Sequence, residues 1–76
     1  MPEAPMLTRF FELEGSVARE ALGRLGATLL AEGARVRLLA STDRPGLYLL
    51  VAESRHWPAA PPPQGCRVWT FQRASA

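Results

Sequence analysis

The sequence contains no lysine, no asparagine and no isoleucine, and it has one cysteine and one histidine, Cys66 and His56. A single cysteine cannot form a disulfide within the chain, and a structural zinc site needs about four cysteine or histidine ligands. The missing lysine excludes catalysis through a lysine Schiff base. We therefore expect neither a disulfide scaffold nor a metal site.

Concentrated positive charge is also missing. All nine basic residues are arginine, they are dispersed among seven acidic residues, and the net charge is +2. Proteins that bind nucleic acid usually concentrate basic charge on one face, so no nucleic-acid partner is expected. The absent residue types share A/T-rich codons, which predicts a bacterial source with a high-GC genome. Selection of arginine for guanidinium chemistry is the alternative.

Long apolar runs are absent as well. No run approaches the roughly 20 residues that a membrane-spanning helix needs. The first residues, Met-Pro-Glu-Ala-Pro, lack the basic start and apolar centre of a secretory signal. We expect a cytoplasmic protein with no membrane partner.

A chain of 76 residues is long enough for one domain, which we place at residues 1–76, with residues 1–5 and 74–76 as disordered tails. At this size a single core is marginal, and oligomerisation, a metal or disulfides usually add stability. Because the composition argues against metal and disulfide, we expect a homodimer.

Four segments have the alternating or continuous apolar pattern of β-strands. They are Met6 to Glu14, Arg35 to Thr42, Leu47 to Glu53 and Cys66 to Arg73. A short turn joins the second to the third, which predicts that these two strands are antiparallel. The third is almost continuously apolar and is expected to be central or covered on both faces.

One segment, Ser16 to Glu32, has the three-and-four apolar spacing of an amphipathic helix. The Ser16 hydroxyl is a candidate N-cap, and Gly33 is placed to end the helix in a left-handed conformation. Gly26 lies on the apolar stripe, where it costs about 0.5 to 1 kcal/mol relative to alanine unless close packing requires it. We therefore expect Gly26 to contact the sheet.

A stretch from Ser54 to Gly65 stands where a second helix would be expected. It contains Trp57 and four of the seven prolines, Pro58 and Pro61 to Pro63, which exclude a regular helix. A single helix covers about one face of a small sheet, because packed layers lie about 10 Å apart. We expect the proline segment to patch the helical side and the opposite face to need a partner.

This order of elements, with EGARVRLLASTDRPGLYLLVAES in its middle, resembles the first half of the ferredoxin-like proteins that form dimeric α/β barrels. The similarity is greatest to the antibiotic-biosynthesis-monooxygenase type. In that family a helix ending in glycine precedes a strand, a turn with Asp and Pro or Gly, and a strand ending in an acidic residue. Glu32-Gly33, Asp43 to Gly46 and Glu53 match in kind.

The resemblance covers about residues 6 to 57 and implies a sheet-to-sheet dimer. The chain departs from the family in lacking the second helix. It also cannot supply the Asn, Trp and His of the haem-degrading members, because it has no asparagine. The resemblance therefore bears on the fold and the dimer more than on an activity.

Tyr48, His56 and Trp57 are the candidates for a ligand-binding site between the helix and the sheet. His56 offers a proton donor or acceptor, and Trp57 offers a flat wall to a small apolar or aromatic ligand. The alternative is that Trp57 fills the space of the absent helix beside a solvated His56. Haem ligation by His56 is disfavoured, and no cofactor is expected.

Aromatic residues form a second candidate site. Tyr48, Trp69 and Phe71 could stack bases, as in RNA-recognition domains of a related fold. Packing in the core or across a dimer interface is favoured instead, because aromatic residues are enriched on such surfaces.

No residue is assigned a catalytic role. Cys66 is predicted to be a small core residue rather than a reactive thiol. Glu12, Glu14 and Glu53 are expected to be solvated or paired with arginine rather than to act as an acid and base pair.

These patterns predict an α+β fold, a ferredoxin-like β-α-β-β-β antiparallel sheet with one helix on one face, assembled as a sheet-to-sheet dimer. The predicted function is a small homodimeric ligand-binding or regulatory module. A non-enzymatic role is favoured because acid-base chemistry needs positioned titratable groups and the chain has one histidine. A cofactor-independent monooxygenase-like enzyme on an aromatic substrate and a protein-interaction subunit are the alternatives.

Overall fold

The computed structural model describes residues 4–74, in which one helix and four strands are formed. They are β1 (Leu7–Glu14), α1 (Ala18–Ala31), β2 (Arg35–Ala40), β3 (Leu47–Ser54) and β4 (Arg67–Gln72). The predicted α+β class and the β-α-β-β-β order are confirmed. Of the predicted disordered tails, residues 1–3 and 75–76 lie outside the described residues.

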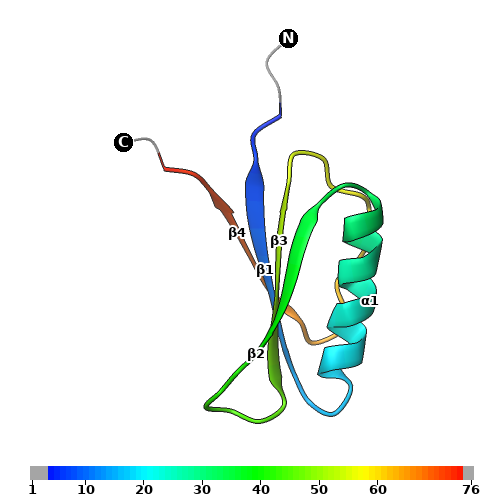
Figure 1. Cartoon of the computed structure of the whole chain (residues 1–76), viewed down its shortest axis with the longest axis vertical. Coiled ribbons are helices and arrows are strands. Elements are labelled where there is room, and N and C mark those ends of the chain that lie inside the picture. Colours follow the sequence, from blue (N-terminus) through cyan, green and yellow to red (C-terminus); the bar gives the residue numbers. More distant parts are fainter. Residues whose placement is uncertain (1–3, 75–76) are drawn as a thin grey trace.

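The strands form one antiparallel sheet in the order β2-β3-β1-β4, and α1 lies on one of its faces (Figure 1). α1 joins β1 to β2, which lie on either side of β3. β4 pairs with the other side of β1, so β1 and β3 are central and β2 and β4 are the edges. One helix on an open four-stranded antiparallel sheet is compatible with a ferredoxin-like fold.

The core lies between α1 and the face of the sheet that the helix covers. Gly26 brings the two layers together, because a Cβ added at this position would lie 3.1 Å from Cδ1 of the fully buried Leu50. The predicted contact between Gly26 and the sheet is therefore confirmed. The buried residues of this cluster are Phe11, Leu22, Leu25, Leu29, Ala34, Leu50 and Ala52.

The start of α1 differs from the prediction. Ser16 is not the N-cap; Val17 occupies that position, and no side chain caps the helix there. Backbone groups hold the first turn instead, since the Ala18 N–H donates to the Gly15 carbonyl at 3.2 Å. The end of α1 agrees with the prediction, because Gly33 has a φ of 96° and follows the last turn.

The turn between β2 and β3 begins earlier than predicted, so β2 ends at Ala40 rather than at Thr42. The Ser41 hydroxyl oxygen accepts hydrogen bonds from the backbone N–H groups of Asp43 and Arg44, at 3.2 and 3.0 Å. A serine that bonds the following backbone in this way competes with the strand ladder, which explains the shortened strand.

The proline segment covers part of the helical side, as predicted. Trp57, Ala60 and Cys66 pack against the buried core, and Pro61 and Pro63 lie beside α1. The indole N–H of Trp57 donates to the Ser54 carbonyl at 3.1 Å and so fixes the start of the segment.

β4 receives little of this cover. α1 packs on β1, β2 and β3, whereas all six residues of β4 are exposed. The strand therefore extends beyond the helix, as Figure 1 shows. In residues 4–74, no helix is long and apolar enough to cross a membrane.

Candidate functional site

The face of the sheet opposite α1 is the candidate functional site, and we call it the open face. Side chains alternate between the two faces of a strand, and Phe11, Leu50 and Ala52 point to the core. Their neighbours along each strand therefore point away from α1. The open face comprises Thr8, Phe10, Glu12, Glu14, Arg35, Arg37, Leu39, Leu47, Leu49, Val51, Glu53, Arg67, Trp69 and Phe71.

An apolar patch occupies the centre of the open face. The strand register aligns Phe10 with Val51 on one side and Trp69 on the other. Phe71 packs edge-on against Phe10, with ring centroids 5.3 Å apart. Trp69 remains 42% exposed and Phe71 56% exposed. Two exposed aromatic side chains thus lie beside Phe10 and the buried Val51, on a face that no helix or strand of the described chain covers.

A hollow of about 690 Å³ lies beside this patch. Phe10, Phe71 and Met6 supply apolar walls, and the Thr8 hydroxyl donates to Glu53 Oε2 at 3.3 Å. Its other lining residues are Arg55, Gln72 and Arg73. An apolar floor with a charged rim suits a flat apolar molecule that carries one or two polar groups.

Charge on the open face is segregated by strand. The edge strands carry arginine, with Arg35 and Arg37 on β2 and Arg67 on β4, whereas the central strands carry glutamate. The glutamates lie toward the strand ends: Glu53 at one end of β3, and Glu12 and Glu14 at the opposite end of β1. The apolar patch therefore has negative ends and positive edges.

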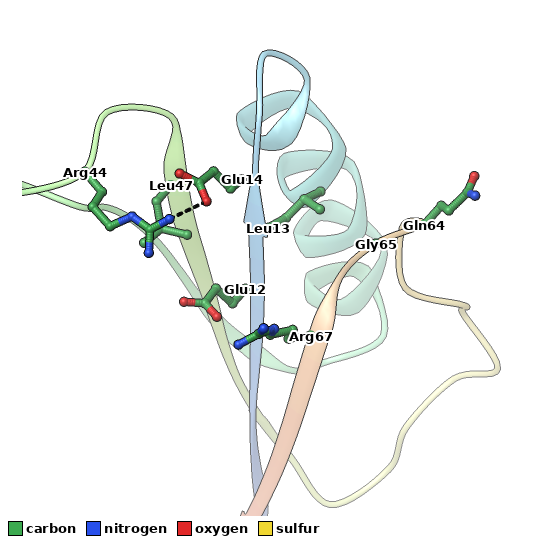
Figure 2. Close-up of a pocket in the computed structure, with 8 residues that line it drawn as sticks. All are labelled: Glu12, Leu13, Glu14, Arg44, Leu47, Gln64, Gly65 and Arg67. Atoms are coloured by element: carbon green, nitrogen blue, oxygen red, sulfur yellow. Dashed lines mark hydrogen bonds and ion pairs between the residues drawn. The ribbon is translucent and has the colours of Figure 1, made fainter.

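A second, more polar cavity of about 380 Å³ lies where β1 ends and β4 begins (Figure 2). Arg44 Nη2 donates to Glu14 Oε1 at 2.7 Å, but the two side chains are 64% and 47% exposed. An exposed ion pair of this kind contributes about 0 to 1 kcal/mol. Figure 2 shows Glu12 and Arg67 on the same side of the sheet, and both residues line this cavity. Its remaining lining residues are Leu13, Leu47, Gln64 and Gly65.

Cys66 borders this region but is not an activated nucleophile. Burial raises the pKa of its thiol, and the negative charge of Glu12 raises it further. Both effects keep the thiol protonated near neutral pH, and only the thiolate is a good nucleophile. The prediction that Cys66 packs as a small residue is confirmed by its contact with the core.

The three predicted ligand-binding residues lie on β3 and just after it. Tyr48 is the second residue of β3 and pairs with Leu13 and Ala40. His56 and Trp57 follow the end of β3, and the Trp57 ring turns back over Arg9, which pairs with Ala52. The ligand-binding role of the three residues together therefore stays a prediction.

Packing describes the surroundings of these residues better. Tyr48 and Trp57 both pack against the core, and His56 is exposed. The Ser54 hydroxyl donates to the His56 carbonyl at 2.8 Å and accepts from the His56 backbone N–H at 3.2 Å. Trp57 thus occupies space on the helical side beside an exposed His56, which is the packing alternative stated above.

The sequence predicts Arg9 or Arg35 as an ion-pair partner of Glu12 and Glu14, but Arg9 lies on the other face of β1, on the side of Phe11. Its guanidinium lies over the Trp57 ring at 4.5 Å, and its Nε is buried without a hydrogen-bond partner. The signal was present, because Arg9 falls on the apolar side of β1 together with Leu7 and Phe11. Its stacking on Trp57 ties the proline segment to the central strand of the sheet.

The described residues form no group of three or more His, Cys, Asp or Glu side chains that could hold a metal ion. Comparison of the chain with protein families, with curated proteins and with solved structures finds no match. The likeness to the antibiotic-biosynthesis-monooxygenase type therefore rests on the sequence pattern alone.

Proposed function

We propose that the chain is a non-enzymatic module that dimerises through its open face and binds a small apolar or aromatic ligand between the two sheets. The observation that carries this proposal is the apolar patch of Phe10, Val51, Trp69 and Phe71, in which Trp69 and Phe71 are exposed, Phe10 is partly buried and Val51 is buried by its neighbours. We also propose that the chain is related to the ferredoxin-like proteins and that it is a cytoplasmic protein of bacterial origin.

The area of the open face supports a dimer. Four strands about 4.8 Å apart and about seven residues long give a flat area of roughly 440 Å², to which side-chain relief adds. A standard interface buries about 800 Å² of accessible surface on each partner. The flat area is a little over half of that standard, so the open face suits a homodimer at the small end of the range for specific interfaces.

The apolar contribution can be estimated from two aromatic side chains. Trp69 and Phe71 retain 42% and 56% of their accessible surface. At about 200 Å² for each side chain and about 25 cal/mol per Å², burying the remainder contributes roughly 5 kcal/mol per copy before the entropic cost of association. This contribution is comparable with the roughly 3 to 5 kcal/mol that a single core of this size supplies.

The charge pattern favours two sheets that cross at about 90°. In that arrangement the ends of the central strands of one copy lie over the edge strands of the other. Glu53 of one copy then approaches Arg37 of the other, and Glu12 approaches Arg67. The hollow beside Phe10 and Phe71 would be closed by the second sheet, which makes it the proposed ligand chamber.

The substitution Leu39→Glu tests the interface. Leu39 is a 42% exposed residue of the open face, so a glutamate there is tolerated in the monomer but opposes an apolar interface. Light scattering and sedimentation equilibrium should show a two-fold lower mass. Leu30→Glu is the matched control, because Leu30 is 58% exposed on α1. A wild-type chain that is monomeric at micromolar concentration, or an L39E variant with unchanged mass, contradicts the proposal.

A further inference from the structure

The two edges of the sheet are protected to different degrees. β2, with sequence RVRLLA, carries two arginines within the strand. β4, with sequence RVWTFQ, has no charge after Arg67 and no proline, and all six of its residues are exposed. Natural sheets normally guard an edge with charges, proline or a covering element, because an open edge pairs readily with another strand.

β4 lacks cover on three sides. It pairs with β1 along one side, so the backbone N–H and C=O groups that point the other way have no strand partner within residues 4–74. α1 packs on β1, β2 and β3 and does not reach β4. On the open face Trp69 and Phe71 are exposed, and on the helical side Val68 is 40% exposed. This combination is typical of a strand that is completed by another strand.

We propose that β4 pairs antiparallel with β4 of a second copy, which joins two sheets into one of eight strands. An antiparallel pair of identical strands has two-fold symmetry, so one surface serves both copies and the assembly closes. A second copy therefore brings the complementary strand with it, and no foreign peptide is needed.

The sequence of β4 selects one register for this pair. With Trp69 on the two-fold axis, the two Trp69 side chains face each other, Arg67 lies opposite Phe71, and Val68 lies opposite Thr70. These are aromatic, cation-π and β-branched cross-strand pairs, each of which stabilises a sheet.

A register shifted to place Thr70 on the axis is less favourable. It would put Arg67 of each copy directly opposite Arg73 of the other. Like charges directly opposite each other destabilise a strand pair. Repulsion between Arg67 and Arg73 therefore disfavours the register with Thr70 on the axis and favours the register with Trp69 on the axis.

The edge contact is independent of the contact proposed for the open face, because it uses the backbone side of β4 rather than the face of the sheet. If both contacts form, each copy has one partner on its open face and another along β4, and the assembly closes as a tetramer only where the two-fold axes of the two contacts intersect. Each contact can therefore be removed without the other.

The substitution Val68→Lys tests the edge. A lysine on an edge strand opposes strand pairing. The matched control is Leu38→Lys, since Leu38 is 39% exposed on the same face of the opposite edge strand, close to the 40% of Val68. V68K should halve the native mass, L38K should leave it unchanged, and V68K combined with L39E should give a monomer. An unchanged mass for V68K overturns the edge pairing, whereas an unchanged mass for L39E alone overturns only the face contact.

Disulfide trapping tests the register and does not depend on a lysine variant that folds poorly. In a Cys66→Ser background, Val68→Cys and Thr70→Cys chains are mixed and oxidised. Directly opposite cysteines have Cα atoms about 4.5 to 5.5 Å apart, which suits a disulfide. The mixture should give a heterodisulfide at least ten times faster than a Leu38→Cys control self-links. Equal rates, or faster self-linking of T70C, overturn the proposed pairing.

Discussion

Replacing Arg9 by methionine is expected to stabilise the fold. Arg9 lies on the covered side of β1, and its Nε is buried with no hydrogen-bond partner. A buried unsatisfied donor costs about 1 to 3 kcal/mol. The opposing contribution is the stacking of its guanidinium on Trp57, at 4.5 Å from the ring centroid. A cation-π contact of this kind contributes about 0.5 to 2 kcal/mol, depending on its exposure.

Methionine retains most of the packing while removing the donor. Its unbranched side chain follows a path similar to the arginine stem, and its sulfur makes favourable contacts of about 0.3 to 1.5 kcal/mol with aromatic rings. The cation-π contact is thus partly replaced, and the desolvation cost disappears. We expect Arg9→Met to raise the free energy of unfolding by about 1 kcal/mol, which corresponds to roughly 4 to 8 °C in Tm for a domain of this size.

Urea unfolding followed by circular dichroism at one fixed protein concentration measures this change, because self-association makes stability depend on concentration. Arg19→Met, at an exposed position of α1, is the control and should change stability by less than about 0.5 kcal/mol. A loss of 1 kcal/mol or more in R9M would refute the reasoning. It would mean that the stacked charge stabilises the proline segment by more than the buried Nε costs.

Three further results are expected. Leu22→Ala should lower the free energy of unfolding by about 2 to 5 kcal/mol, measured in urea, because Leu22 is fully buried under the sheet; a loss below 1 kcal/mol would contradict the core. Gly33→Ala should cost about 1 kcal/mol in the same assay, because its φ of 96° disfavours a side chain; an unchanged midpoint would contradict this. Cys66 should react with iodoacetamide more slowly than free cysteine at pH 8, because burial and Glu12 raise the pKa of its thiol. A faster reaction, followed by mass spectrometry, would contradict that environment.

The order of elements could be predicted from sequence because each is determined by a local pattern. The spacing of apolar residues indicates α1, and the prolines exclude a second helix between β3 and β4. Gly26 was predictable because a glycine on an apolar stripe is costly unless two layers meet there. The N-cap of α1 could not be predicted from the sequence. Ser16 stands at a suitable position, but backbone hydrogen bonds form the first turn and its hydroxyl does not cap the helix.

The candidate site was predictable only in part. The sequence predicts four strands and one helix, and one helix covers only one face of a sheet, so an uncovered face was expected. In the structure the described chain leaves the open face uncovered. The grouping of Tyr48 with His56 and Trp57 stays a prediction, and the eight residues of β3 separate the backbone ends of that strand by about 20 Å. The exposure of β4 depends on how far α1 and the proline segment reach across the sheet, which no local pattern determines.

The path of the proline segment accounts for the positions of the two proposed contacts, one on the open face and one along the edge of β4. A regular second helix between β3 and β4 would pack on the helical side over β1 and β4, just as α1 packs over β1, β2 and β3. The proline segment instead keeps close to α1 and covers the core through Trp57 and Ala60, so it protects β1 and leaves β4 bare. β4 then holds its place through its ladder to β1 and the contact of Phe71 with Phe10. A strand so weakly held gains more from a second copy than any other part of the sheet, on its face and along its edge.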